Sequence, residues 1–214
     1  MNAREGETCG VGMRLRRPAM GKVVAALSMS LDGFVADEND SVSALFGWYQ
    51  NGDVEVPTAD PRRTFQVTAA SARFLKPLLD DAGALVCGRR LFDRTDGWGG
   101  RHPAGCPVFV VSHGMPGGWP RDDADVTFWT DAISALEAAQ KVAGDRVVGV
   151  STPMLTRQYL DAGLLDEIIV SLVPILLGAG TRLFETLVVT PVRLGDPEVI
   201  EGRDVTHLTY RVLR

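Results

Sequence analysis

The segment Ala82–Gly100 most constrains the fold, because in it a short apolar run passes straight into a helix through a single glycine. The run Ala84–Cys87 has the length and composition of a buried strand. Gly88 ends the run, and Arg89 and Arg90 follow at the start of a short helical stretch. The start of a helix offers free backbone N–H groups, which stabilise an anion, and guanidinium groups suit phosphate. The segment indicates either a phosphate-binding turn or an ordinary β–α turn with its arginines in solvent.

A second turn of the same kind occurs later in the chain. The core strand predicted at Arg146–Val150 runs into Ser151-Thr152-Pro153 and then into a helix predicted at Met154–Ala162. A hydroxyl residue followed by proline is a typical helix start, so simple capping by Thr152 is one interpretation. Two strands that each end at the start of a helix also favour a shared ligand site.

The remaining elements alternate between strands and helices. We predict strands at Lys22–Ser28, Pro107–Ser112, Val126–Trp129, Asp166–Pro174, Thr186–Leu194 and Val205–Leu213, and helices at Thr68–Asp80 and Asp131–Ala143. Asp131 is the predicted N-cap of its helix, and Pro77 predicts a kink or a late break. Ser112 and His113 follow a strand, where His113 is either a solvent-facing loop residue or a contact to a phosphate or base.

The turn after the first strand carries Asp32, Gly33 and Phe34. One interpretation is a tight hairpin in which Asp32 caps its own backbone. The other is a loop over a ligand, with Asp32 as a polar contact and Phe34 as an apolar wall. The long segment Glu38–Thr64, which contains Trp48, is expected to govern the choice of substrate, because a loop of this length is uncommon unless it is functional or holds a short helix.

The composition excludes several classes of function. The chain has 214 residues, enough for one domain with a proper core, and a formal net charge of −5, which argues against a general nucleic-acid surface. Its three cysteines have neither the number nor the spacing of a disulfide framework or a zinc site, so no metal is expected. No stretch approaches the roughly 18 apolar residues of a membrane span. We expect a cytoplasmic protein without membrane or nucleic-acid partners, with residues 1–19 as a disordered extension and 20–214 as the domain.

Taken in order, the motifs resemble those of a known family. They are SLDGF after the first strand, GRRLFD after a mid-chain strand, and then PVFVVSH, RQYLDAGLLDEI and VPILLGAGTRLF. In this order and spacing the chain, from Met20 to its end, resembles the dihydrofolate reductase-like family that contains the reductase (C-terminal) domain of the bifunctional riboflavin-biosynthesis protein. The resemblance implies an α/β fold with a mostly parallel central sheet, flanking helices and antiparallel C-terminal strands. It also implies a homodimer.

The resemblance further implies an NADPH site across the carboxyl ends of the strands. The positions that match cofactor-binding positions of the family are Ala26, Gly88, Arg89, Arg90, Ser112, His113, Val150, Ser151, Thr152, Pro153, Met154 and Leu155. Those that match the substrate side are Asp32, Gly33 and Phe34, and Trp48 of the segment Glu38–Thr64 is a further candidate substrate contact. Asp32 is the candidate catalytic group, with water as the alternative proton source.

Two positions depart from the family's pattern. Relatives usually carry Gly-Gly-Ala where this chain has Ser151-Thr152-Pro153, and often a hydroxyl residue where it has Leu91. Glycine lets the backbone approach a phosphate closely, and proline lacks an amide donor. Losing one hydrogen bond to a charged group costs about 1.5–3 kcal/mol, unless the hydroxyls of Ser151 and Thr152 replace it.

The function that the resemblance implies is an NADPH-dependent reductase similar to 5-amino-6-(5-phosphoribosylamino)uracil reductase and dihydrofolate reductase. Such an enzyme transfers a hydride to a small pterin- or pyrimidine-like heterocycle, with the cofactor carrying the chemistry. The alternatives are a ligand-binding module of the same fold that has lost NADPH binding, and an enzyme of this fold that uses a flavin or deazaflavin.

Overall fold

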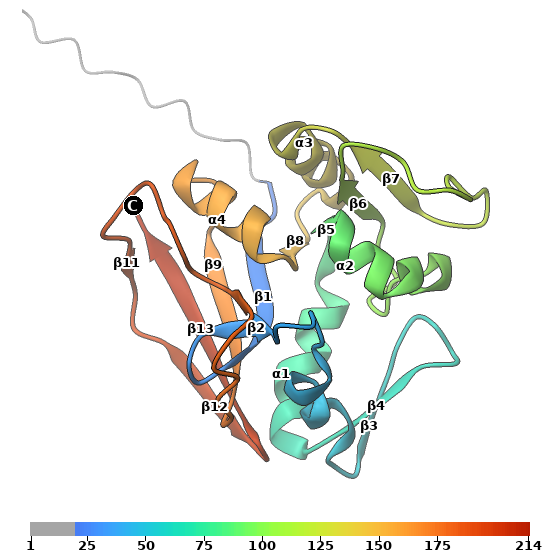
Figure 1. The fold of residues 1–214 in the computed structure, drawn as a ribbon. Helices are drawn as coiled ribbons and strands as arrows, with labels where there is room; N and C mark the ends of the chain where they lie inside the picture. The colour runs from blue at the N-terminus through green and yellow to red at the C-terminus, as the bar shows by residue number, and fades with distance from the viewer. Residues whose placement is uncertain (1–19) are drawn as a thin grey trace, which may run out of the picture.

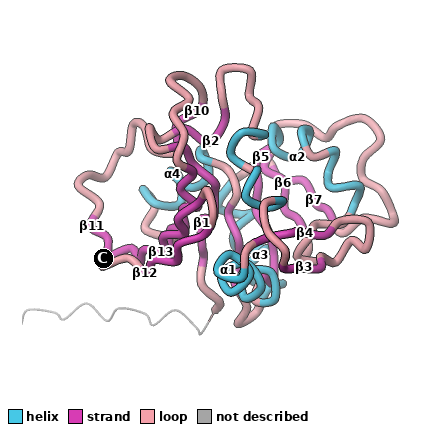
Figure 2. The backbone as a smooth tube through the Cα atoms, turned by 90° about the horizontal axis from the view of Figure 1, so that it is seen from below, coloured by secondary structure: helices cyan, strands magenta, loops and turns pink. Residues whose placement is uncertain are grey.

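The computed structural model describes residues 20–214, in which helices cover both faces of a central sheet (Figures 1 and 2). The predicted extension 1–19 lies outside the described residues. The strands are β1 (Val23–Ser30), β2 (Phe34–Ala36), β3 (Val54–Pro57), β4 (Thr64–Val67), β5 (Ala82–Gly88), β6 (Val108–Val111), β7 (Val126–Trp129), β8 (Val147–Val150), β9 (Glu167–Val173), β10 (Thr181–Arg182), β11 (Arg193–Leu194), β12 (Glu198–Gly202) and β13 (Val205–Leu213). The helices are α1 (Ala69–Asp80), α2 (Arg89–Arg94), α3 (Ala132–Ala143) and α4 (Pro153–Asp161), with 3-10 turns η1 (Ser43–Leu45), η2 (Gly47–Gln50) and η3 (Asp96–Gly100).

The main sheet has the order β11-β13-β9-β1-β8-β5-β6-β7, with β12 paired to β13. Every neighbouring pair from β9 to β7 is parallel, whereas β13 runs antiparallel to β9, β11 and β12. The predicted fold class is therefore confirmed. Parallel strands are covered on both faces, which is why β5, β6 and β8 are almost wholly apolar.

Alternate residues of the central strands face two different layers. On one face, Val86 and Val150 pack with α3 and α4 in one core cluster. On the other face, Val24 packs with α1 in a second cluster, and Cys87 packs with Phe92 of α2 in a third. The second and third clusters thus share the face of the sheet opposite α3 and α4, and the gap between them lies on that face.

Most predicted elements are present, and the differences have physical causes. Asp131 caps α3 as predicted, because its carboxylate accepts a hydrogen bond from the backbone N–H of Ser134 at 2.7 Å. Helix α1 runs through Pro77 to Asp80. Of the strand predicted at Thr186–Leu194, only its last two residues are extended in the sheet.

That strand is interrupted because Thr186 has a left-handed backbone, with φ at 53°. The N–H groups of Val188 and Val189 are also bound to the carboxylate of Asp161, each at 3.0 Å, instead of to a neighbouring strand. The segment Glu38–Thr64, whose structure the sequence left open, contains both 3-10 turns η1 and η2 and the hairpin strand β3. Within residues 20–214, no helix combines the length and apolar character that crossing a membrane requires.

Candidate functional site

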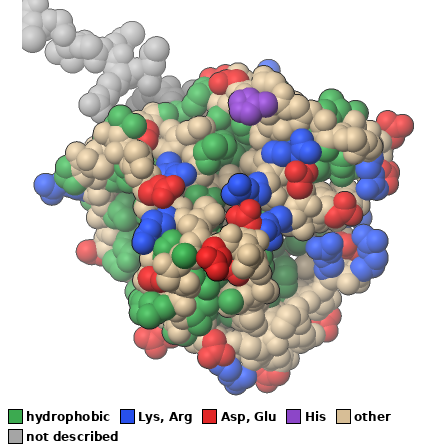
Figure 3. All heavy atoms as spheres, in the orientation of Figure 1, with side chains coloured by type: hydrophobic (Ala, Val, Ile, Leu, Met, Phe, Trp, Pro, Cys, Tyr) green, Lys and Arg blue, Asp and Glu red, His purple; other side chains and the backbone are tan. Residues whose placement is uncertain are grey.

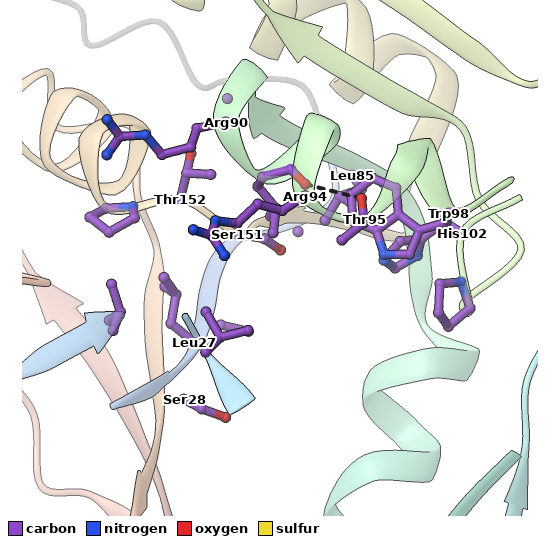
Figure 4. A pocket seen from close by; sticks show the side chains of 18 of the residues that line it. Leu27, Ser28, Leu85, Arg90, Arg94, Thr95, Trp98, His102, Ser151 and Thr152 are labelled. Atoms are coloured by element: carbon purple, nitrogen blue, oxygen red, sulfur yellow. Dashed lines mark hydrogen bonds between the residues drawn. The ribbon is translucent and has the colours of Figure 1, made fainter. Parts of the chain in front are cut away.

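A large cavity opens at the point in the sheet where the connections from neighbouring strands run in opposite directions. The chain leaves β5 through α2 to reach β6 on one side, and leaves the neighbouring strand β8 through α4 to reach β9 on the other side. A crevice forms at such a switch point beyond the carboxyl ends of the strands. The cavity has a volume of about 1380 Å³ and continues between the α1 and α2 clusters. Figure 4 shows Thr152, Ser151 and Arg94 along one border, with Leu27 and Ser28 opposite Trp98 and His102.

The two β–α turns meet at this crevice, as the sequence predicts. A Cβ atom placed on Gly88 would lie 3.5 Å from Thr152 Oγ1, so the ends of β5 and β8 are in close contact. Thr152 occupies the N-cap position of α4, yet its side chain makes no capping hydrogen bond. Its Oγ1 is buried and has no partner among the described residues. Side-chain capping therefore does not explain this hydroxyl, which lies at the start of α4.

Basic side chains surround the mouth of the cavity although the whole chain is acidic. The arginines that line it are Arg63, Arg89, Arg90, Arg94 and Arg157. Arg90 and Arg94 share Asp40 at 3.4 and 3.8 Å, and Arg157 pairs with Glu185 at 3.0 Å. Figure 3 shows basic and acidic side chains alternating across the middle of this face. Exposed ion pairs of this kind contribute about 0–1 kcal/mol each, so an anionic ligand can replace the acidic partners at little cost.

At the far end of the crevice, Ser112, His113 and Thr130 follow strands β6 and β7 and line the cavity. The Ser112 hydroxyl donates to the carbonyl of Gly114 at 2.6 Å, and Arg89 donates to the same carbonyl at 3.0 Å. These contacts hold the loop after β6 against the start of α2. Polar groups and an exposed imidazole therefore form this end of the cavity.

The opposite end is mainly apolar and aromatic. Phe46, Tyr49 and Phe65 lie on one side and Trp98 and His102 on the other. Burial raises the pKa of Tyr49 to about 12, so its hydroxyl stays protonated at neutral pH. Burial also lowers the pKa of His102 to about 4, which keeps the imidazole neutral.

His102 has a defined tautomer. Its Nδ1 accepts a hydrogen bond from the backbone N–H of Ala104 at 3.2 Å, so the ring proton resides on Nε2. In the described part of the chain, no three histidine, cysteine, aspartate or glutamate side chains lie close enough together to hold a metal ion.

The structure brings most of the predicted cofactor-binding residues together on the cavity. Those that line it are Ala26, Gly88, Arg89, Arg90, Ser112, His113, Ser151, Thr152, Pro153 and Met154. Val150 and Leu155 do not line it, because both are fully buried in the core cluster beneath α3 and α4. Val150 and Leu155 instead flank the turn Ser151–Pro153 on its core side.

The predicted substrate-side residues are placed elsewhere, which corrects the expected site. Asp32, Gly33 and Phe34 do not line the cavity. The Asp32 carboxylate accepts a hydrogen bond from the Ser30 hydroxyl at 2.6 Å and from the N–H groups of Leu177 and Gly178 at 3.1 and 2.7 Å. These bonds lower its pKa to about 2, the largest effect coming from Ser30. A carboxylate held in this way ties two loops together and is a poor proton donor.

Trp48 is likewise behind the cavity, with 2% of its surface exposed. Its neighbours Phe46 and Tyr49 line the cavity in the place predicted for Trp48. Trp98 also lines the cavity and is not among the predicted site residues, because its only signal in the sequence is an aromatic residue inside a glycine cluster. Its backbone is left-handed, with φ at 54°, a conformation uncommon outside glycine. Trp98, which lies on this turn, lines the cavity.

Comparison with known proteins yields a family and a set of related folds. A family model described as the RibD C-terminal domain matches residues 21–201. No curated protein sequence matches the chain. A putative riboflavin biosynthesis protein from Shewanella sp. PV-4 is 24% identical, with a TM-score of 0.65, over 90% of this chain and 99% of that one.

Two further solved structures share the fold. Dihydrofolate reductase from Enterococcus faecalis, complexed with NADP(H) and RAB-propyl, is 15% identical, with a TM-score of 0.56, over 91% of this chain and 98% of that one. The deaminase/5-amino-6-(5-phosphoribosylamino)uracil reductase from Thermotoga maritima is 12% identical, with a TM-score of 0.57, over 91% of this chain and 57% of that one. At these identities the likeness shows the fold alone.

Proposed function

Because the chain belongs to the RibD C-terminal domain family, we propose that it is a reductase that binds NADPH in the crevice beyond the carboxyl ends of β5 and β8. Its substrate in this proposal is a pterin- or pyrimidine-like heterocycle, reduced at a C=N or C=O carbon. The observation that carries the proposal is the buried Thr152 hydroxyl, which has no partner among residues 20–214 and lies at the start of α4. A buried hydroxyl without a partner is costly, and a phosphate oxygen would satisfy it.

The surrounding residues fit a dinucleotide that carries an additional phosphate. The start of α4 and the Thr152 hydroxyl suit a pyrophosphate. Arg89, Arg90 and Arg94 suit a further phosphate, because guanidinium groups bind phosphate oxygens in pairs. The cavity volume of about 1380 Å³ exceeds the roughly 300–1,000 Å³ of an ordinary single-ligand pocket, so a cofactor and a substrate can lie side by side. The E. faecalis relative, solved with NADP(H), supports the same reading of the cleft.

Bound NADPH supplies the hydride. The chain's own residues contribute an apolar surface that includes Ala26 and Leu27 of β1 together with Phe46 and Phe65. This surface excludes water from the hydride path and orients a flat ring against it. Asp32 does not supply the proton, because its carboxylate is engaged elsewhere and stays ionised. Lining hydroxyl groups or water remain as proton sources.

One observation favours a second function, that of a binding module without NADPH. Pro153 is the first residue of α4, so the first turn of that helix lacks one N–H donor. Ser151 and Thr152 also place side chains where relatives usually have glycines. If these changes prevent a phosphate from approaching, the cleft binds only a smaller ligand. An enzyme of this fold that uses a flavin or deazaflavin is the remaining alternative.

Titration with NADPH, followed by the nicotinamide fluorescence, separates these functions. The reductase proposal predicts a dissociation constant on the order of micromolar for the unmodified protein. The control is the variant Ser151→Gly/Thr152→Gly/Pro153→Ala, which restores a glycine-rich turn. Binding by this variant alone would identify a binding module, and binding by neither protein would contradict the NADPH proposal.

A further inference from the structure

Two hydroxyl groups lie side by side on the floor of the apolar end of the cavity. Ser28 of β1 and Ser171 of β9 are direct partners in the parallel register, and both line the cavity. Neighbouring strands are about 4.8 Å apart, so the two side chains on the same face are close neighbours. Their exposed fractions are only 7% and 5%, which means that a ligand would meet them away from bulk water.

The Ser28 hydroxyl is held from behind by an indole. Trp48 Nε1 donates a hydrogen bond to Ser28 Oγ at 3.1 Å. Because an indole N–H can only donate, Ser28 accepts this bond and keeps its own proton free. Trp48, which does not line the cavity, therefore acts on it through Ser28.

The Ser171 hydroxyl is held from behind by an imidazole. His207 Nδ1 lies 2.9 Å from Ser171 Oγ, and His207 Nε2 lies 3.0 Å from Ser71 Oγ. His207 is 1% exposed and stacks on Phe74, with ring centroids 3.9 Å apart. Burial lowers the pKa of His207 to about 4, so at neutral pH the ring carries one proton only.

The hydrogen bonds around His207 fix the nitrogen that carries this proton. Thr68 Oγ1 accepts the N–H of Ser71 and donates to Ser71 Oγ at 3.3 Å. Ser71 is fully buried, and a buried hydroxyl normally finds an acceptor for its proton. Because Thr68 Oγ1 donates to Ser71 Oγ, the partner left to accept the Ser71 proton among residues 20–214 is His207 Nε2. The ring proton is accordingly on Nδ1 and points at Ser171 Oγ, which leaves the Ser171 proton free. Both serines thus accept a ring N–H from behind and can donate forward.

Acidic groups are placed away from this floor. Among the described residues that line the cavity, the only carboxylates are those of Asp40 and Glu185, and both pair with arginines at the mouth. A ring edge that carries amino groups needs acceptors such as a carboxylate, whereas a ring edge that carries carbonyl oxygens needs donors.

We propose that Ser28 and Ser171 form a donor pair that selects substrates with two carbonyl oxygens on the buried edge. His207 is a positioning residue that directs the Ser171 hydroxyl into the cavity. The inference rests on the proposed function, since it identifies the floor of the same cleft as the substrate side.

Two fluorescent pteridines with different edge groups test the proposal. Lumazine carries two carbonyl groups where 2,4-diaminopteridine carries two amino groups. We expect the full chain, saturated with NADPH, to bind lumazine at least tenfold more tightly than the diamino compound. Ser28→Ala and Ser171→Ala should each weaken lumazine binding roughly fivefold to tenfold, the loss expected for one hydrogen bond between neutral groups.

The variant His207→Gln distinguishes positioning from a merely structural role. Positioning predicts that the ratio of the two pteridine affinities falls while the NADPH affinity is unchanged, whereas a structural defect lowers all three affinities together. Thr209→Val is the matched control, because it removes a hydroxyl from the same strand without touching the cavity. Equal affinity for both pteridines, no lumazine binding, or unchanged binding in both serine variants would overturn the inference. The NADPH titration of the same samples reports separately on the proposed function.

Discussion

Replacing Thr152 by valine should move the stability of the free protein and its affinity for NADPH in opposite directions. Valine has nearly the same shape as threonine and lacks the hydroxyl. Because Thr152 Oγ1 is buried and has no partner in residues 20–214, its removal breaks no hydrogen bond in the free protein. It also removes a polar atom from an apolar setting, where an unsatisfied group costs about 1–3 kcal/mol.

The expected gain in the free energy of unfolding is therefore about 1 kcal/mol, which corresponds to a rise in Tm of roughly 2–4 °C for a chain of this size. The same hydroxyl, when bound to a phosphate, contributes about 1.5–3 kcal/mol. Its loss should weaken NADPH binding by about tenfold to hundredfold.

The assay is urea unfolding of the free protein together with calorimetric titration with NADPH. Thr156→Val is the matched control, because Thr156 Oγ1 donates to the carbonyl of Thr152 at 2.9 Å. That variant should lose stability where Thr152→Val gains it. If Thr152→Val instead destabilises the free protein and leaves the NADPH affinity unchanged, the hydroxyl serves the fold and not a ligand.

Three further outcomes are expected. Asp32→Asn should lower the urea midpoint at pH 7, and its difference from the unmodified protein should shrink from pH 4 toward pH 2, because the folded state holds the Asp32 pKa at about 2 and protonation removes the benefit of the charge; a constant difference would contradict this. Stability should fall from pH 6.5 toward pH 4, by at most about 1.4 kcal/mol per pH unit for each histidine, because the unfolded chain protonates His102 and His207 before the folded protein does. His102→Asn should remove the contribution of one histidine, at most about 1.4 kcal/mol per pH unit, from this dependence of stability on pH. An unchanged dependence would show that His102 is not buried in its neutral form. Arg94→Ala should weaken NADPH binding about threefold to tenfold at low salt and less at high salt, and an effect independent of salt would argue against contact with a phosphate.

Local sequence patterns predict the elements and the meeting of the two β–α turns. Gly88 and Thr152 are 64 positions apart in the chain, yet each follows an apolar strand and begins a helix, and the parallel sheet brings these ends together. The cap at Asp131 is predicted for the same reason, because its signal lies within a few residues.

Partners distant in the sequence account for what the patterns do not predict. The role of Asp32 is decided by backbone N–H groups of the loop after β9, which no local motif identifies. The capping interpretation of Thr152 is wrong because its hydroxyl makes no hydrogen bond to the helix N–H groups, an outcome that the local sequence does not determine. Ser171 joins the candidate site only through its register with Ser28 and its contact with His207.

Hydrogen–deuterium exchange with and without NADPH tests whether the crevice beyond the carboxyl ends of β5 and β8 is the nucleotide site. If NADPH binds there, exchange slows in peptides that cover the start of α4 and the loops after β5 and β6, while β11 and β12 at the far edge of the sheet stay unchanged. Protection confined to other parts of the chain, or no protection at NADPH concentrations that saturate binding, would contradict the claim.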